Sequence, residues 1–209
     1  MSLWDRLTGK SSGGQERPPL THIRDLQIGD ILELGYVAPA GLSNERLRVT
    51  EIETYEYAEG LLTTFEVVNA AGDHFTVASA SDEGRDVMAV SRTLPRKEVE
   101  TLLDMEAFGQ IFAEGAGTPV KVLAHPPHYE GWLPDTYVEE VDAVVGYYHA
   151  GDYRKRQLPE NGGEKFDGYE LKSPDENFGL EVEVYLDGET EVSIVVFIPA
   201  SHIEGLWAS

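Results

Sequence analysis

Residues 65–103 read FEVVNAAGDHFTVASASDEGRDVMAVSRTLPRKEVETLL, and residues 169–207 read YELKSPDENFGLEVEVYLDGETEVSIVVFIPASHIEGLW. The two stretches align without a gap at an offset of 104 residues, half of the 209-residue chain. Each has the pattern of an aromatic-led strand, a turn, a second strand, an acidic turn with glycine, a third strand, and a proline before a helical turn. The pattern predicts two related β-rich units in tandem.

The repeat is imperfect in two places. Arg92 stands where the second stretch has Val196. The middle strands also alternate one residue out of phase, with Phe75 and Val77 set against Val182 and its neighbours. A β-bulge or a small insertion explains this shift if the repeat is genuine. A chance alignment is the alternative, and the sequence leaves both open.

We expect an α+β protein that is mostly β. Each of the two tandem related units is expected to be a curved antiparallel sheet, half-barrel-like in shape and closed by a short helix. Residues 1–19 are predicted to be a short amphipathic helix and a flexible linker. Residues 20–117 form the first unit with its terminal helix, and residues 118–209 form the second unit with a C-terminal helix.

Two helices and one turn are the clearest local predictions. Pro95 suits the first turn of a helix, and apolar residues recur after it at helical spacing. The second helix is expected from Pro199 to Trp207, with Trp207 facing the core. Asp187-Gly188 predicts a tight hairpin, because this pair readily takes positive φ angles. It precedes a strand in which alternate residues from Val192 to Ile198 are apolar.

The chain is strongly acidic. It has 16 Lys and Arg against 38 Asp and Glu, and a formal net charge of −22. Such a charge repels phosphate backbones, so we expect no direct binding of nucleic acid. It suits a basic protein partner, polyamines, or mimicry of nucleic acid. The acids are dispersed rather than gathered in one tail, which favours solubility as their main role.

The first residues carry a separate candidate contact. Leu3, Trp4 and Leu7 fall on one face of a short helical pattern, followed by the linker 11–19. This helix either docks on a partner, lies on a membrane surface through residues 1–10, or packs back on its own domain. No apolar run is long enough to span a bilayer, and an apolar signal core is missing near the start, so we expect a cytoplasmic protein.

The residues that usually carry chemistry form no specific motif. The chain has no cysteine, which excludes disulfides and Cys-ligated metals. His125 and His128 are separated by prolines and lack the geometry of a helical metal-binding pair. Carboxylates such as Glu139 and Glu140 fit a solvated face. The sequence predicts no catalytic residue, no metal site and no cofactor, and therefore a protein that is not an enzyme.

Five residues are candidates for contacting a ligand in a cleft between the two units: Tyr129, Trp132, Tyr147, His149 and Arg154. Each has a structural alternative. The aromatic pair near position 130 fits the core better than a groove. Because side chains alternate along a strand, only one of the two adjacent residues Tyr147 and Tyr148 can face solvent. Arg154 opens the basic run 154–156, which fits a loop beside an exposed strand as well as a ligand site.

Several segments together resemble an uncharacterised bacterial domain-of-unknown-function family. They are LWDRLTG (3–9), LQIGDILEL (26–34), YEYAEGLLTTFEV (55–67) and IPASHIEGLW (198–207). Members of that family tend to be encoded near relatives of phage-shock protein A and near polyamine-synthesis enzymes. The resemblance implies a bacterial cytosolic accessory protein with a link to envelope stress. It assigns no functional residue.

The first functional hypothesis is a non-enzymatic interaction module, in which the acidic surface of the second unit binds a protein partner that the sequence does not identify. The second is a small-ligand binder or enzyme using the cleft between the units. The third is a peripheral membrane stress accessory anchored by the first ten residues. The sequence does not indicate an oligomeric state.

Overall fold

The computed structural model describes residues 19–82, 85–113, 119–160 and 162–209. These residues form 11 strands, each antiparallel to its neighbours, which confirms the mostly β class. The strands are β1 (Ile31–Leu34), β2 (Arg46–Tyr57), β3 (Gly60–Val68), β4 (His74–Asp82), β5 (Arg85–Thr93), β6 (Val120–Lys121), β7 (Thr136–Ala150), β8 (Glu164–Lys172), β9 (Phe178–Tyr185), β10 (Thr190–Pro199) and β11 (Ile203–Trp207). The helices are α2 (Arg96–Leu102) and α3 (Met105–Gln110), with 3-10 turns η1 (Ile23–Asp25), η2 (Pro127–Tyr129) and η3 (Ala200–His202).

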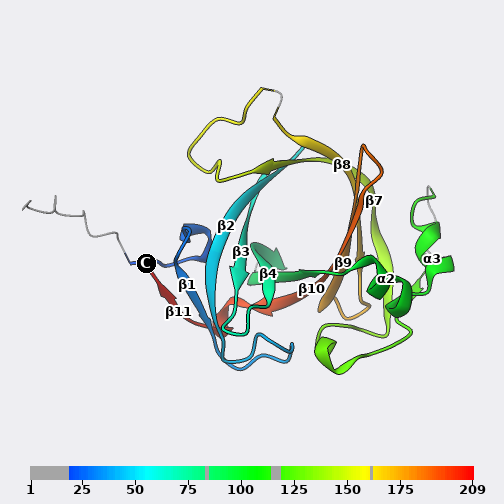
Figure 1. Ribbon diagram of the computed structural model, residues 1–209, viewed down its shortest axis with the longest axis horizontal. Helices are drawn as coiled ribbons and strands as arrows, with labels where there is room; N and C mark the ends of the chain where they lie inside the picture. The colour runs from blue at the N-terminus through cyan, green and yellow to red at the C-terminus, as the bar shows by residue number, and fades with distance from the viewer. Residues whose placement is uncertain (1–18, 83–84, 114–118, 161) are drawn as a thin grey trace, which may run out of the picture.

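Eight of these strands close into one barrel, seen end-on in Figure 1. Around the ring, β2, β3, β4, β5, β10, β9, β8 and β7 pair in that order, and β7 then pairs with β2. Along this last pairing, Glu53 lies opposite Ala150 and Glu56 lies opposite Tyr147. Every strand of the ring therefore has a partner on both sides, and the ring exposes no unpaired edge.

The two halves of the chain supply equal parts of the ring. Strands β2–β5 form one four-stranded meander and β7–β10 form another, and the meanders pair through β5 with β10 and through β2 with β7. The expected half-barrels thus share a single continuous wall, because both edges of each meander find a partner in the other. A common origin of the two halves stays a prediction.

The predicted hairpin and core strand in the second half are confirmed. Gly188 has a φ of +89°, and the Tyr185 N–H donates a 2.9 Å hydrogen bond to the Glu189 carbonyl. Glycine accepts this backbone conformation without steric cost. In the strand that follows, Val192 and Ile198 are each 5% exposed, and the alternate residues between them are also buried.

The helix predicted after Pro95 forms but breaks in two. Helix α2 ends at Leu102, and Leu103 turns into an isolated β-bridge with Val122. Asp104 then starts α3, where its carboxylate accepts hydrogen bonds from the N–H groups of two residues in the first turn. Aspartate at this position stabilises a helix N-terminus, so a new helix begins here.

The predicted C-terminal helix is wrong. Residues 203–207 instead form β11, which pairs with β1 and places Leu206 opposite Leu32. The free edge of β1 offers backbone hydrogen bonds, and Gly205 weakens a helix at this point. Trp207 is 55% exposed rather than buried, and its indole N–H donates a 2.9 Å hydrogen bond to Glu33.

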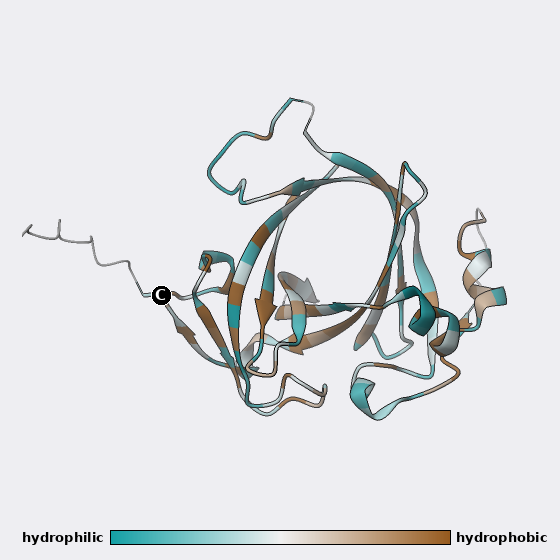
Figure 2. Ribbon diagram, viewed as in Figure 1, coloured by the Kyte–Doolittle hydropathy of each residue, from teal (hydrophilic) through white to brown (hydrophobic). Residues whose placement is uncertain are grey.

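The apolar core lies on the outer face of the barrel wall. Because side chains alternate along a strand, residues such as Phe65, Val77 and Val90 face away from the lumen. Helices α2 and α3 lie outside the ring (Figure 1), and Phe112 packs edge-on against Tyr169 with their ring centroids 5.1 Å apart. Figure 2 shows hydrophobic and hydrophilic residues alternating along the barrel strands. The inner face of the wall thus receives most of the polar side chains of these strands, together with aromatic and small apolar ones.

Trp132 joins the loops to the wall. It is fully buried and stacks on Phe75 with a centroid distance of 5.6 Å and an interplanar angle of 3°. Its indole N–H donates a 2.9 Å hydrogen bond to the Ala40 carbonyl. One side chain therefore contacts two segments far from it in the chain.

We expect Trp132→Ala to lower the free energy of unfolding by about 3–5 kcal/mol, because it leaves a large cavity and an unpaired carbonyl. Trp207→Ala is the matched control, and its loss should stay below about 1 kcal/mol because that ring is exposed. Urea denaturation measures both. Equal losses would contradict this assignment of the core.

Candidate functional site

The barrel encloses a cavity of about 1200 Å³. All eight strands of the ring contribute to its wall, mostly through alternate residues. Residues that line it include Glu53, Tyr55, Tyr57, Leu62, Thr64, Glu66, His74, Thr76, Ala78, Ala89, Ser91, Thr93, Val144, Tyr148, Glu164, Phe166, Gly168, Glu170, Glu181, Glu183, Tyr185, Glu191, Ser193 and Val195. This volume is slightly larger than the roughly 300–1,000 Å³ that is usual for small-molecule binding sites.

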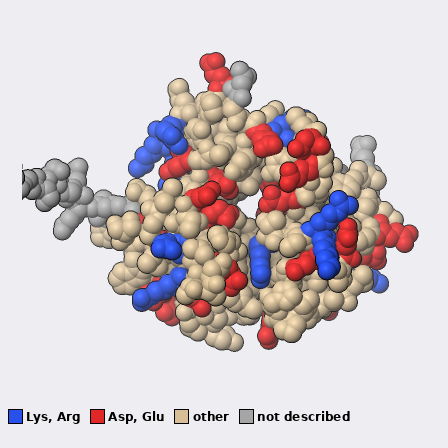
Figure 3. Space-filling view, in the orientation of Figure 1, with Lys and Arg blue, Asp and Glu red and all other residues tan. Residues whose placement is uncertain are grey.

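The wall of this cavity is acidic. Its ten acids are Glu53, Glu59, Glu66, Asp73, Glu164, Glu170, Glu181, Glu183, Glu189 and Glu191. The described basic residues of the wall are Arg92 and His74, and the Arg92 guanidinium already stacks on the Tyr129 ring at 4.9 Å. Acidic side chains surround the hollow at the centre of the face in Figure 3. The lumen therefore has a large excess of negative charge.

Strand register sets like charges directly opposite one another. On β9, Glu181 lies opposite Glu170 of β8, and Glu183 lies opposite Glu191 of β10. Opposed like charges on neighbouring strands destabilise a sheet by up to about 1 kcal/mol per pair. Two such pairs occur side by side along β9. When these acids are ionised, the repulsion is an uncompensated cost to the free protein, which a cation in the lumen would relieve.

The pKa values of these acids reflect that cost. Burial raises the pKa of Glu181 to about 8, and repulsion from Glu170 and Glu183 raises it further. Burial also raises the pKa of Glu183 to about 7, against a hydrogen bond from Tyr185 that lowers it. Glu181 is enclosed by protein yet accessible to water, since the cavity itself admits water. Near neutral pH this part of the lumen holds exchangeable protons.

Two more carboxylates lie on the β2–β3 side of the lumen. Burial raises the pKa of Glu53 and of Glu66 above the usual range. Tyr148 donates a 2.5 Å hydrogen bond to Glu53, and the Thr76 hydroxyl donates to Glu66. Each carboxylate keeps oxygen lone pairs beyond the one that its partner uses.

Aromatic rings form a band between the acids. The centroid of the Tyr55 ring lies 5.5 Å from that of Tyr148 and 5.9 Å from that of Phe166, and both ring pairs are edge-on. Phe166 fits only because Gly146 stands opposite it, where a Cβ atom would lie 2.3 Å from the ring. Burial raises the pKa of Tyr55 above its usual range, so the phenol stays neutral. Ring faces beside carboxylates are a known environment for ammonium groups.

One polar atom in the wall is unsatisfied. The Thr64 hydroxyl oxygen is buried, lines the cavity, and has no hydrogen-bond partner among the described residues. The residue is 5% exposed. Buried hydroxyl groups are nearly always paired, and this oxygen can pair with a molecule in the lumen once the side chain turns toward the cavity.

Two of the sequence-predicted contact residues belong to the core. Trp132 is packed as described above, and Tyr129 is 3% exposed with its hydroxyl donating to Glu98. Neither lines the lumen. The burial of both side chains agrees with the interpretation that they belong to the core. The two four-stranded meanders share one continuous wall.

Tyr147, His149 and Arg154 lie on the outer side of the wall. His149 is buried opposite Thr54, and its Nε2 atom is 3.0 Å from a carboxylate oxygen of Glu56. Tyr147 is 39% exposed, whereas the next residue, Tyr148, lines the lumen. This alternation agrees with the expectation that only one of the two tyrosines faces solvent.

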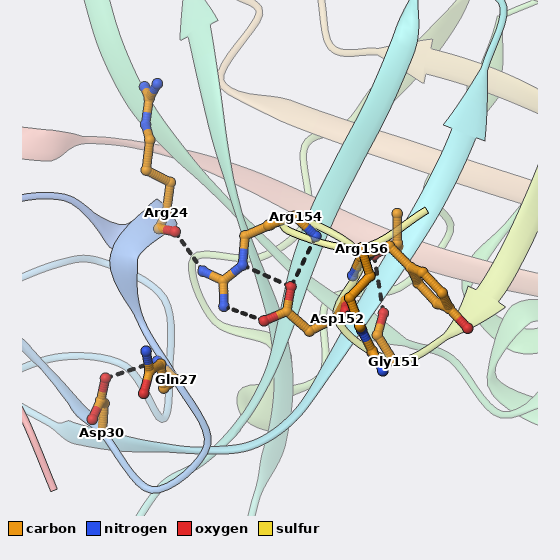
Figure 4. Close-up of polar contacts among 9 residues, drawn as sticks. Arg24, Gln27, Asp30, Gly151, Asp152, Arg154 and Arg156 are labelled. Carbon is orange, nitrogen blue, oxygen red and sulfur yellow. Dashed lines mark hydrogen bonds and ion pairs between the residues drawn. The ribbon is translucent and has the colours of Figure 1, made fainter. Parts of the chain in front are cut away.

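Arg154 is used to hold its own loop (Figure 4). Its Nε and Nη2 atoms bind both carboxylate oxygens of Asp152 at 2.9 and 2.7 Å, and Nη1 donates to the Arg24 carbonyl. The guanidinium also lies 5.2 Å from the centre of the Phe65 ring. These contacts fasten the loop after β7 to the barrel, which supports the loop interpretation of the basic run.

Leu3, Trp4 and Leu7 lie outside the described residues, so contact of residues 1–10 with a partner or membrane stays a prediction. In the part of the chain that is described, neither helix has the length and apolar character required to cross a bilayer. The described residues also contain no group of three His, Asp or Glu side chains placed to hold a metal ion.

The sequence analysis did not identify the lumen carboxylates. The sequence feature that could have indicated them is the alternation in residues 180–185, LEVEVY. In this stretch Glu181, Glu183 and Tyr185 follow one another at intervals of two residues. A strand half exposed to solvent has the same pattern. No family model matches the chain, and neither the curated proteins nor the solved structures contain a significant match.

The raised pKa values predict how stability depends on pH. Glu181 and Glu183 hold protons in the folded state at pH values where an unfolded glutamate, with a pKa of 4.5, has lost them. The free energy of unfolding should therefore fall as pH rises from about 5 to about 8. We expect the Tm of the free protein to fall over this range.

Glu181→Gln should flatten that profile, because it removes one of the titrating groups and one like-charge contact. At pH 8.5 its Tm should be about 2–4 °C above that of the unmodified protein, which corresponds to roughly 1 kcal/mol. Glu160→Gln, at an exposed loop position, is the control and should change nothing. Differential scanning calorimetry checks both, and a Tm that rises with pH would refute the charge assignment.

Proposed function

We propose that the protein binds a small organic cation in the barrel lumen. The observation that carries this proposal is the two pairs of opposed glutamates that β9 forms with its neighbours, Glu181 with Glu170 of β8 and Glu183 with Glu191 of β10. They face a cavity of about 1200 Å³ in which the acids greatly outnumber the bases. A bound cation would stabilise the charges that destabilise the free protein. This is the small-ligand hypothesis, located inside the barrel instead of between two units.

An organic cation fits this wall better than a metal ion. Metal ions require several ligands within about 2–2.6 Å of one point. Acids of the wall are instead spread over β2, β3, β8, β9 and β10, and the described residues offer no three-ligand cluster. An ammonium compound can contact separate carboxylates and also use the faces of Tyr55 and Tyr148.

The tandem-repeat hypothesis is consistent with a shared lumen. Glu66 of β3 and Glu170 of β8 are equivalent positions of the proposed repeat, and both line the cavity. We infer that the two halves are related units that together build one site. Binding of a protein partner through the acidic surface stays a separate proposal, with no described contact that favours it.

Isothermal titration calorimetry at pH 8.5 tests the proposed function with four probes: n-butylamine, 1,4-diaminobutane, benzylamine and butyrate. At least one amine should bind and butyrate should not. Combined Glu181→Gln and Glu183→Gln should weaken that binding at least tenfold, or about 1.4 kcal/mol, because the ligand loses both central carboxylates. Glu160→Gln should leave it unchanged.

Affinity for the amine should also rise from pH 6 to pH 8.5, because the lumen acids must release protons to bind a cation. Absence of binding by all three amines at pH 8.5 would exclude this function. Equal binding by the double variant would place the site elsewhere.

A further inference from the structure

The two opposed glutamate pairs have a fixed spacing. Glu181 and Glu183 are two residues apart on the same strand, and both point into the lumen. Residues at this spacing lie about 7 Å apart along a strand, at roughly 3.3–3.4 Å per residue. Glu170 and Glu191 extend the two pairs to opposite sides of β9, onto β8 and β10. The centres of the two pairs are therefore about 7 Å apart along β9 and about 5 Å apart across it, at the usual spacing of neighbouring strands. The lumen thus contains two negative subsites about 8 Å apart.

An aromatic ring is close to both subsites. Tyr57 lines the same cavity and stacks on Tyr55 with a centroid distance of 6.5 Å. Its pKa is raised by burial first, and then by the charges of Glu183, Glu181 and Glu170. Tyr57 and the members of both pairs line the same cavity. Its ring offers an apolar face to whatever connects two charges bound there.

We infer that the ligand is a linear diamine whose two ammonium groups are separated by five or six carbons, one bound at each glutamate pair. This inference rests on the proposed function and specifies its ligand class. An extended chain advances about 1.2 Å per bond, so amines joined by five or six carbons lie about 7–8 Å apart. A three-carbon linker is too short to reach both pairs when extended. A monoamine can neutralise only one of them.

The unpaired Thr64 hydroxyl is a second contact for the same ligand. It faces Glu53 across the β2–β3 pairing and lines the cavity without a partner among the described residues. A hydroxyl oxygen accepts hydrogen bonds, and an ammonium group has three N–H donors. The amine bound near Glu183 has more donors than one glutamate pair uses. The pKa of Glu183 is raised by burial first and also by the charge of Glu53, which lies opposite Thr64. Thr64 is therefore on the side of the lumen that Glu183 faces.

The test is a calorimetric series of α,ω-diamines with three to eight carbons, with n-butylamine as the single-charge control, all at pH 8.5. We expect the highest affinity at five or six carbons and at least tenfold weaker binding of n-butylamine. Equal affinity of n-butylamine and 1,5-diaminopentane would overturn the two-subsite inference while leaving the proposed function intact. A maximum at three or at eight carbons would overturn the spacing.

Two variants assign the subsites. Glu191→Gln disrupts one pair and Glu170→Gln the other. Each should weaken 1,5-diaminopentane at least fivefold and change n-butylamine by less than about twofold, because the intact pair still binds one ammonium group. Both replacements remove like-charge repulsion, so the variants should melt no lower than the unmodified protein. Equal losses for the diamine and the monoamine would contradict separate subsites.

Discussion

The short pairing of β2 with β7 is the constraint on which the rest of the molecule depends. It runs from Glu53 opposite Ala150 to Glu56 opposite Tyr147 and turns two meanders into a closed ring. Without it, the polar face of the sheet would be open to bulk solvent and its glutamates would be ordinary surface residues. With it, carboxylates from five strands face one another across an enclosed volume. Gly146 belongs to the same region, since it admits the Phe166 ring that packs beside this pairing.

Closure divides the side chains into an apolar outer layer and a polar lumen. On the outer face, Trp132 stacks on Phe75 and the Arg154 guanidinium lies over Phe65, while helices α2 and α3 lie outside the ring on its other side. These contacts supply the hydrophobic stabilisation that a small barrel usually obtains from its interior. The interior is consequently free to hold acids that oppose folding. A cation that binds these acids would remove the repulsion between them, and so would raise the free energy of unfolding.

Local features of this fold could be predicted from sequence. Strand alternation identified the core strand from Val192 to Ile198, Asp187-Gly188 identified its hairpin, and Pro95 identified the start of a helix. Each depends on residues within a few positions of one another. The C-terminal segment was predicted wrongly, since its strand depends on the unpaired edge of β1, more than 160 residues earlier in the chain.

The candidate site could not be predicted for a similar reason. Alternating glutamates on β9 look the same on a surface strand and in a lumen, and only the closure of the ring distinguishes them. The opposition of Glu181 to Glu170 is set by the register between two strands, which a β-bulge can shift by one residue. The aromatic and basic residues that were chosen instead, such as Trp132 and Arg154, are prominent in the sequence because they stabilise the core and a loop.

The account depends most directly on whether the glutamates of β9 share a lumen that can accept a cation. A carboxyl ¹³C NMR titration of Glu181 and Glu183, with and without saturating 1,4-diaminobutane, measures this at the residues themselves. The account predicts that both titrate well above pH 4.5 in the free protein and that the diamine moves both pKa values down. Ordinary glutamate pKa values that do not respond to the diamine would contradict it.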